Sequence, residues 1–156
     1  MIRIDAVHID TFEAGASLAA HRHANAYAAL VIEGAYQEIS LDGRYDCGVG
    51  SLIIHPHFHQ HADEFGSANG SVLNLPLPGL EADLSGFRVL TTSNSGALIR
   101  LAHDDPEQAG FAALEEAQLC EPVEPPVWMA RFTALIAEDN TASDAALQCG
   151  ISPEHA

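Results

Sequence analysis

Residues 14–34 read AGASLAAHRHANAYAALVIEG, a His-x-His pair followed by an apolar run, with a glycine near each end. In a β-strand the side chains at positions i and i+2 face the same side, so His21 and His23 would point together into whatever the strand encloses. Tyr27 has the same parity if the strand contains no bulge. This stretch predicts a strand that directs polar rings into a shared interior.

The sequence around this stretch, over residues 1–102, indicates short strands separated by turns. Alternating apolar and polar residues, and buried runs bounded by Gly, Pro, Asn or Ser, are typical of such strands. The Asp-Gly pair in LDGRYDCG is a strong hairpin signal. Many short strands at regular spacing favour a mainly β sandwich or barrel. The expected strand segments are IRIDAVHIDTF, YAALVIEGAYQEISL, GSLIIHP, SVLNLPLP and FRVLTTS.

A second histidine run, IIHPHFHQH, follows a strand that begins at a glycine. Two histidines from one strand and a third from a neighbouring strand commonly hold a divalent metal with an open coordination position. His61 is the candidate for that third ligand, beside His21 and His23. We expect His55, His57 and His59 to be surface or rim residues, where such a run can bind adventitious metal.

The spacing of these residues resembles the cupin family. The first cupin motif, G-x5-H-x-H-x(3,4)-E-x6-G, is similar to the sequence from Gly15 through the two histidines to Gly34. The second motif, G-x5-P-x-G-x2-H-x3-N, is matched at Gly50, Pro56 and His61. The resemblance implies a double-stranded β-helix, also called a jelly-roll barrel, with both histidine strands around one interior.

Three positions depart from the cupin motifs. Tyr27 stands at the glutamate position of the first motif, and Phe58 and Phe65 replace the glycine and the asparagine of the second. Three of the four metal ligands that the resemblance implies are therefore retained, and the carboxylate is lost. Three neutral imidazoles suffice for zinc, whereas loss of the carboxylate lowers affinity for iron or manganese. The alternative is a metal-free pocket in which His21, His23 and His61 hydrogen-bond an organic ligand.

The composition excludes several classes of partner. The chain has 156 residues, a net charge of −16, and no lysine, so all six basic residues are arginines. Such a chain repels phosphate backbones and anionic lipid surfaces. Three widely spaced cysteines argue against a disulfide framework, and neither a signal peptide nor an apolar run of about 20 residues is present. These features predict a cytoplasmic protein without a membrane partner.

The periodicity changes after residue 102. DPEQAGFAALEEAQL predicts a helix with Asp105 as N-cap, proline at its first position, and Phe111, Leu114 and Leu119 on one face. An acidic linker, CEPVEPP, leads to a second amphipathic helix in VWMARFTALIAED. The apolar face of that second helix comprises Trp128, Phe132, Leu135 and Ile136.

The end of the sequence, SDAALQCGISPEHA, resembles the start of a helix-turn-helix. Ala146 suits a close helix crossing, Gly150 suits the turn, and Ser152 can cap the next helix. GISPEH is similar to the first helix-turn-helix of AraC-type (arabinose-regulator family) transcription factors. The alternative is an ordinary helix that ends at glycine.

The two resemblances together imply the sensor part of an AraC-type regulator, cut within its first helix-turn-helix. The implied organisation is a barrel over 1–102, a helical linker or dimerisation segment over 103–140, and a truncated DNA-binding start over 141–156. DNA would be bound only through the missing C-terminal domain, because recognition helices supply the base contacts. No DNA-binding residue is expected within the chain itself.

We therefore expect a small-molecule effector to bind Tyr27, His21, His23 and His61, with or without a divalent metal, in a homodimer. The identity of the effector is open, although scarce basic residues disfavour a highly anionic one. The alternative is a small metal-dependent cupin enzyme, such as a dioxygenase, isomerase or decarboxylase. Against it, no catalytic residue can be assigned, because Glu33 and Glu38 lie off the inward parity or beyond the glycine.

Overall fold

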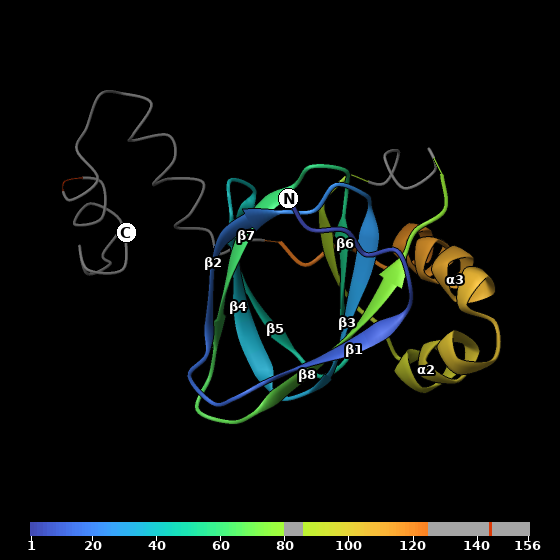
Figure 1. Ribbon diagram of the computed structural model, residues 1–156, viewed down its shortest axis with the longest axis horizontal. Coiled ribbons are helices and arrows are strands. Elements are labelled where there is room, and N and C mark those ends of the chain that lie inside the picture. Colours follow the sequence, from blue (N-terminus) through green and yellow to red (C-terminus); the bar gives the residue numbers. More distant parts are fainter. Residues whose placement is uncertain (80–85, 125–143, 145–156) are drawn as a thin grey trace. The chain divides into compact units, whose positions relative to one another are not determined.

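A computed structural model describes residues 1–79, 86–124 and 144, and its strands form a barrel (Figure 1). Short turns join consecutive strands over residues 8–76, as the punctuated sequence predicts. Their bounds are β1 His8–Phe12, β2 Ser17–Arg22, β3 Tyr27–Glu33, β4 Ala35–Ser40, β5 Gly43–Gly48, β6 Ser51–His55, β7 Gln60–Phe65, β8 Gly70–Pro76 and β9 Arg88–Thr91.

The strands make two antiparallel sheets. One has the order β1-β8-β3-β6-β9 and the other the order β2-β7-β4-β5. Between β2 and β8 the chain crosses repeatedly from one sheet to the other, which is the topology of a jelly roll. The predicted fold class, a mainly β, cupin-like barrel followed by helices, is confirmed.

Two turn positions explain local features of the sequence. In the β4–β5 hairpin Ser40 pairs with Gly43, so the loop is Leu41–Asp42 and Gly43 follows it with φ 144°. Gly34 separates β3 from β4 at φ 71°, and a Cβ there would lie 2.2 Å from the backbone oxygen of Asn69. Only glycine fits this position, because it has no Cβ.

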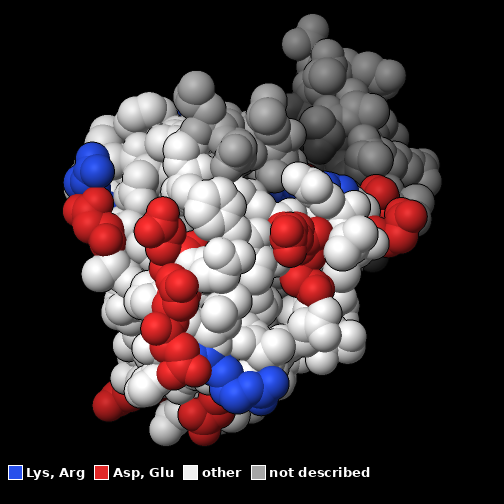
Figure 2. All heavy atoms as spheres, turned by 90° about the vertical axis from the view of Figure 1, so that its right-hand side faces the viewer, with Lys and Arg blue, Asp and Glu red and all other residues white. Residues whose placement is uncertain are grey.

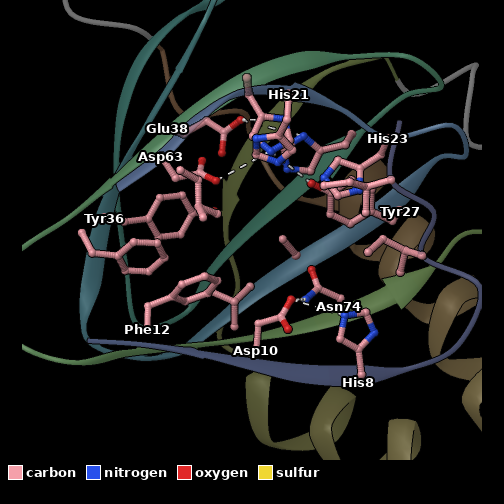
Figure 3. A pocket seen from close by; sticks show the side chains of 18 of the residues that line it. His8, Asp10, Phe12, His21, His23, Tyr27, Tyr36, Glu38, Asp63 and Asn74 are labelled. Atoms are coloured by element: carbon pink, nitrogen blue, oxygen red, sulfur yellow. Dashed lines mark hydrogen bonds and ion pairs between the residues drawn. The ribbon is translucent and has the colours of Figure 1, made fainter. Parts of the chain in front are cut away.

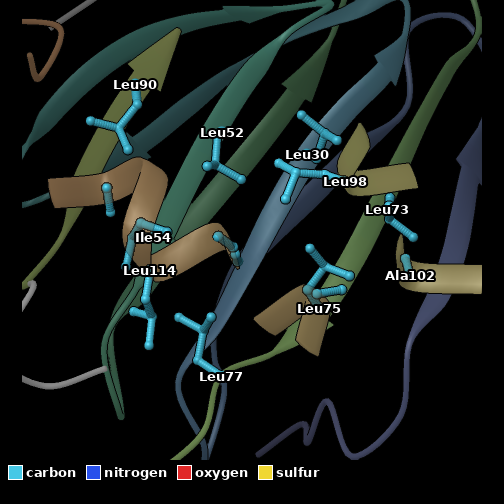
Figure 4. Close-up of a cluster of buried hydrophobic side chains, with 14 of the residues drawn as sticks. Leu30, Leu52, Ile54, Leu73, Leu75, Leu77, Leu90, Leu98, Ala102 and Leu114 are labelled. Carbon is cyan, nitrogen blue, oxygen red and sulfur yellow. The ribbon is translucent and has the colours of Figure 1, made fainter. Parts of the chain in front are cut away.

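Strands β3, β6 and β8 are buried on both faces. Their outward side chains, with those of α2 and α3, form an apolar cluster outside the barrel (Figure 4). Strands covered on both sides lose the apolar–polar alternation, which explains the continuous apolar run in β3. The leucines and isoleucine of this cluster are Leu30, Leu52, Ile54, Leu73, Leu75, Leu77, Leu90, Leu98 and Leu114.

Two helices pack against this sheet. α3 (Pro106–Leu119) begins as predicted, since the Asp105 side chain accepts a hydrogen bond from the Gln108 amide at 3.1 Å. Its buried face differs from the prediction: Leu114 is buried, but Phe111 and Leu119 are exposed. Small residues, including Gly110, face the sheet instead.

The helix α2 (Ser95–Asp104) was not predicted. It begins directly after the short strand β9 and buries Leu98 and Ala102 against the sheet. Its sequence, SGALIRLAHD, contains a glycine in the first turn, and it follows a Ser/Asn-rich stretch that reads as a loop. Tertiary packing, rather than intrinsic propensity, accounts for the helix.

Residues 1–124 form one compact unit. Val123 joins it, since its amide donates to the Val89 carbonyl at 2.7 Å. No helix in the described ranges has the length and hydropathy needed to cross a membrane. The predicted helix with Trp128, Phe132, Leu135 and Ile136, and the predicted helix-turn-helix over 141–156 with Ala146, Gly150 and Ser152, lie outside the described residues, apart from Asp144.

The face that carries α2 and α3 shows acidic side chains spread among uncharged ones, with few basic groups (Figure 2). Exposed acidic residues on these helices and at their junction are Asp104, Asp105, Glu107 and Glu115. The negative charge of the sequence is therefore displayed on this surface and is not confined to the barrel interior.

Candidate functional site in the barrel

A cavity of about 350 Å³ lies inside the barrel, between its two sheets (Figure 3). This volume falls in the range of small-molecule sites. The side chains that line it come from both sheets and from the N-terminal segment, among them Ile4, Asp10, Phe12, His21, His23, Tyr27, Tyr36, Glu38, His55, His61, Asp63, Phe65, Val72 and Asn74.

The three histidines expected to act together meet at one end of this cavity. His21 on β2 pairs with His61 on β7, and their ring centroids are 4.3 Å apart. His23 lies just beyond β2, with its ring 5.0 Å from that of His21 and 5.4 Å from that of His61. One nitrogen from each of the three rings lies within 4.8 Å of the others, so one ion could contact all three.

The orientation of His21 suits a metal ligand. Its Nδ1 lies 2.9 Å from the Ala19 carbonyl oxygen, which can only accept a hydrogen bond. Nδ1 therefore carries the proton and Nε2 keeps its lone pair. Metal-binding histidines are commonly fixed in this way by a carbonyl or carboxylate partner.

Tyr27 lies beside the histidines, at the position of the missing glutamate. Its hydroxyl oxygen is 3.4 Å from His61 Nε2, and its ring stacks on His55 at 4.4 Å. The side chain is buried, and this burial together with the carboxylates of Glu38 and Asp63 raises the Tyr27 pKa well above its usual value. Tyr27 is therefore a neutral hydrogen-bonding group in the cavity wall.

Two carboxyl groups lie next to His61: that of Glu38, which the sequence analysis expected off the interior, and that of Asp63, which it did not mention. Glu38, on β4, is fully buried and directs its carboxyl group toward the histidines (Figure 3). Its Oε1 is 3.8 Å from His61 Nδ1 and 3.8 Å from His55 Nδ1. Asp63 Oδ2 is 3.8 Å from His61 Nε2. The expectation that Glu38 would lie off the interior was wrong, because β4 directs Tyr36 and Glu38 inward.

Burial controls the ionisation of this group. It raises the pKa of Glu38 well above the usual carboxyl value, with the Asp63 charge adding to the effect, and it raises the pKa of Asp63 to about 6. It lowers the pKa of His23 to about 4 and that of His61 to about 3, helped by neighbouring imidazoles. The imidazoles of His23 and His61 are thus neutral near pH 7, which is the form that binds metals.

His55, His57 and His59 differ in burial, although all three were expected at the surface or rim. His55, expected at the rim, is 1% exposed and lines the cavity, so that expectation was wrong. His59 is partly buried, with Nε2 2.9 Å from Asp42 Oδ2 and Nδ1 3.2 Å from His55 Nδ1. His57 is exposed, as expected, and its Nδ1 contacts the Ala24 carbonyl at 3.2 Å.

The opposite end of the cavity is apolar. Phe12 and Phe65 stack with ring centroids 4.1 Å apart, and Tyr36 stacks on Phe65 at 5.1 Å. Phe65, at the asparagine position of the second motif, therefore builds this apolar floor. A separate polar pair, in which Asn74 donates to Asp10 at 3.0 Å, lies below the histidines in the view of Figure 3.

The other departure in the second motif keeps the backbone geometry of glycine. Phe58 adopts φ 60°, and it is the one described non-glycine residue in the left-handed region. This conformation is costly for a bulky residue. Its amide donates to the His23 carbonyl at 3.0 Å, which joins the turn before β7 to the end of β2.

The donor set fits a divalent metal. Buried side-chain atoms of four cavity residues lack a hydrogen-bond partner, and the large penalty of burying such atoms is relieved when they bind a ligand or an ion. These atoms are His23 Nδ1, His61 Nδ1, Asp63 Oδ1 and both carboxyl oxygens of Glu38. His21, His23 and His61 would hold the ion, which would supply Lewis acidity at an open position.

Strand parity could have found the missed residues. Asp63 and Phe65 share the face of His61 on β7, and Glu38 shares the face of Tyr36 on β4. His55 lies two residues after Ile53 and pairs with Tyr27 across β3 and β6. The sequence placed His61 on a neighbouring strand but did not indicate the bounds of that strand, β7, because the histidine run and its proline masked the alternation.

Comparison with known proteins gives structural likeness only. No known protein-family profile matches the sequence, and no curated protein matches it. A solved cupin superfamily protein from Desulfitobacterium hafniense is 20% identical over 46% of this chain and 66% of its own, with a TM-score of 0.40. This chain spans just under two thirds of that protein's length.

Structures of ToxT from Vibrio cholerae align over far more of the chain. One covers 94% of this chain and 71% of ToxT, with 7% identity and a TM-score of 0.53. Another, bound to (E)-4-(8-methylnaphthalen-1-yl)but-3-enoic acid, covers 91% and 70%, with 7% identity and a TM-score of 0.55. At this identity the likeness supports the fold and nothing finer.

Proposed function

We propose that the chain is the effector-sensing part of an AraC-type transcriptional regulator, with the effector bound inside the barrel. The observation that carries this proposal is that β3, β6 and β8 serve two surfaces at once. They line the cavity with Tyr27, His55 and Asn74, and they hold α2 and α3 with their opposite faces. An effector that shifts these strands also changes how α2 and α3 pack on them. Binding can then favour one of two conformations of the protein, which differ in the position of the helices.

Two further observations support a regulator. The GISPEH stretch resembles the AraC-type helix-turn-helix, and the fold is similar to that of ToxT, an AraC-family regulator. DNA contact would belong to a following domain, because the chain is strongly acidic.

The cavity suggests the class of effector. Its wall carries the carboxyl groups of Asp10, Glu38 and Asp63, while its apolar end is aromatic. Arg3 also contacts the cavity, but it is exposed and paired with Asp5 at 3.0 Å. An uncharged or cationic aromatic molecule is therefore favoured over an anion, since Asp63, ionised above its pKa of about 6, repels negative charge.

The test uses N-phenyl-1-naphthylamine, an uncharged fluorescent aromatic, against its anionic relative 1-anilinonaphthalene-8-sulfonate. We expect the amine to bind more tightly and to change amide hydrogen exchange in α2 and α3. Ala29→Leu, which fills the cavity from β3, should abolish binding, while the exposed variant His57→Ala should bind as wild type does. Tight binding that leaves the exchange of α2 and α3 unchanged would contradict the sensing role.

The expected homodimer remains part of this proposal. Ile99, Phe111 and Leu119 are apolar side chains that α2 and α3 leave exposed, and apolar groups of this kind often lie in subunit contacts. Light scattering of the chain should give twice the monomer mass, and Leu119→Glu should lower it. A monomer at every accessible concentration would remove the dimer from the proposal.

A metal-dependent cupin enzyme is the second candidate, and one observation favours it. Glu38 and Asp63 restore carboxyl groups beside His61, where the first motif had lost one. Zinc is the metal that three imidazoles suit best, and the carboxyl groups extend the choice to iron or manganese. Mass spectrometry of bound small molecules separates the two candidates. A sensor returns its ligand unchanged, whereas an enzyme converts it and loses this activity after chelation.

A further inference from the structure

A second group of ligands lies beside the three-histidine group and shares His61 with it, while its other members stand at no ligand position of the cupin motifs matched above. We propose that Glu38, His55, His59 and His61 form a second site for a divalent transition-metal ion. One ligand atom from each of these four side chains lies within 4.8 Å of the other three. The inference holds whether the chain is a sensor or an enzyme.

The buried carboxyl group of Glu38 is the first argument. Glu38 is 1% exposed, and neither of its carboxyl oxygens has a hydrogen-bond partner. Its titratable neighbours are the imidazoles of His55 and His61 at 3.8 Å and the acid Asp63, whose charge raises the Glu38 pKa, and the sequence has no lysine. A buried carboxyl group needs a positive partner or a proton, and a metal ion between it and the imidazoles supplies that charge.

The orientation of His59 is the second argument. Its Nε2 lies 2.9 Å from Asp42 Oδ2, so Nε2 donates to the carboxylate and Nδ1 keeps its lone pair. The His59 Nδ1 atom is 3.2 Å from His55 Nδ1. A carboxylate behind a histidine is the usual arrangement for orienting a metal ligand, with Asp42 acting as the positioning residue.

The surroundings provide both access and shielding. A second cavity of about 420 Å³, lined in part by Asp42, His59 and His61, gives a route to the ligands from outside the barrel. On another side the Phe87 ring stacks on His59 at 4.3 Å with an interplanar angle of 18°. Three imidazoles and one carboxylate are a donor set suited to zinc, cobalt, nickel, copper or iron, and not to magnesium or calcium.

The competing arrangement has no ion. In it His55 Nδ1 donates a hydrogen bond to His59 Nδ1, and Glu38 keeps a proton because burial and the neighbouring Asp63 raise its pKa. This arrangement predicts that His59 is irrelevant to metal affinity, which makes the two arrangements experimentally distinct.

The experiment titrates the chelator-treated full chain with cobalt(II) chloride, followed by visible absorption and by elemental analysis after dialysis. His59→Ala and His55→Ala remove ligands unique to the second group, and His21→Ala removes one unique to the first. His57→Ala, an exposed histidine in the same run, is the matched control. We expect His59→Ala to weaken one class of cobalt binding at least tenfold, and Asp42→Asn to weaken it by about tenfold, as orienting partners do.

His21→Ala and His57→Ala should retain that class of binding. A wild-type isotherm in both His59→Ala and His55→Ala, or no cobalt binding by the wild type, would overturn the proposal. Because His59 is only partly buried, its variant should fold even where His55→Ala does not, and circular dichroism checks this. Loss of all binding in His21→Ala alone would assign the metal to the three-histidine group.

Discussion

The two faces of β3, β6 and β8 have opposite characters. The outer face, against α2 and α3, buries leucine, isoleucine and alanine side chains, whereas the inner face places the polar groups of Tyr27, His55 and Asn74 among apolar ones. On β8, for example, Leu73 and Leu75 face the helices while Val72 and Asn74 face the cavity. The outer face supplies stability, which allows the inner face to carry buried polar groups that a simple core would not tolerate.

The largest effect should come from the outer face. Leu75→Ala removes a fully buried side chain and leaves a cavity between β8 and the helices, so unfolding free energy should fall by about 2–5 kcal/mol. Val72→Ala, on the same strand but beside an existing cavity, should cost about 1.5 kcal/mol. Urea denaturation measures both, and equal losses would break the distinction between the faces.

A second pair of variants sharpens the view of the helix contact. Gly110 in α3 lies so close to β8 that a Cβ would be 2.6 Å from the Pro76 oxygen. Gly110→Ala should therefore destabilise the protein by about 1–3 kcal/mol, despite the better helix propensity of alanine. Gly96→Ala in α2, where the nearest atom is a flexible arginine nitrogen at 3.5 Å, should be neutral or stabilising. Thermal unfolding that ranks the two variants in the opposite order would contradict the close contact.

Across the cavity from that inner face, on β4 of the other sheet, a substitution should change stability in the opposite direction. Glu38→Gln keeps the shape of the side chain and removes a buried acid whose pKa is raised by burial. The metal-free protein should become more stable by about 1 kcal/mol near pH 7, because the folded state no longer holds a desolvated carboxyl group. Calorimetry of chelator-treated protein tests this, and cobalt affinity should fall in the same variant. A less stable metal-free variant would show that Glu38 is satisfied without an ion.

The smallest expected effect is a change in pH dependence. His23 and His61 have folded pKa values of about 4 and 3, below the usual 6.5, so the unfolded chain binds more protons as pH falls from 6.5 towards 4. Stability should decline over that window, partly offset by Asp63, whose pKa of about 6 lets the folded state take up a proton first, and by Glu38, whose pKa burial also raises. Urea midpoints at pH 7, 6 and 5 should decline less steeply in His23→Gln, and an unchanged slope would contradict the burial of His23.

The sequence predicted most of the barrel because its turns and its motif spacings are local signals. Gly34 and the proline after β6 mark strand ends, and His21, His23, His61 and Tyr27 meet in the cavity as expected. The sequence reading missed α2, whose helix depends on packing that no local pattern records. It also missed Glu38 and His55, because β-strand parity had to be assigned on strands whose ends were uncertain, and a one-residue error exchanges the faces.

The imidazole of His61 affects how many metal ions the protein can bind at once. Its ring is common to both ligand groups, with Nδ1 directed at Glu38 and Nε2 at Tyr27 and Asp63. A neutral imidazole offers one lone pair, so His61 can bind a second ion only after its remaining N–H proton is lost to solvent. That cost, together with the repulsion between the two ions, means that a second equivalent should enter against a penalty set by the first. Occupancy would then be anticooperative, and a preparation saturated at one equivalent could contain a mixture of two singly loaded species.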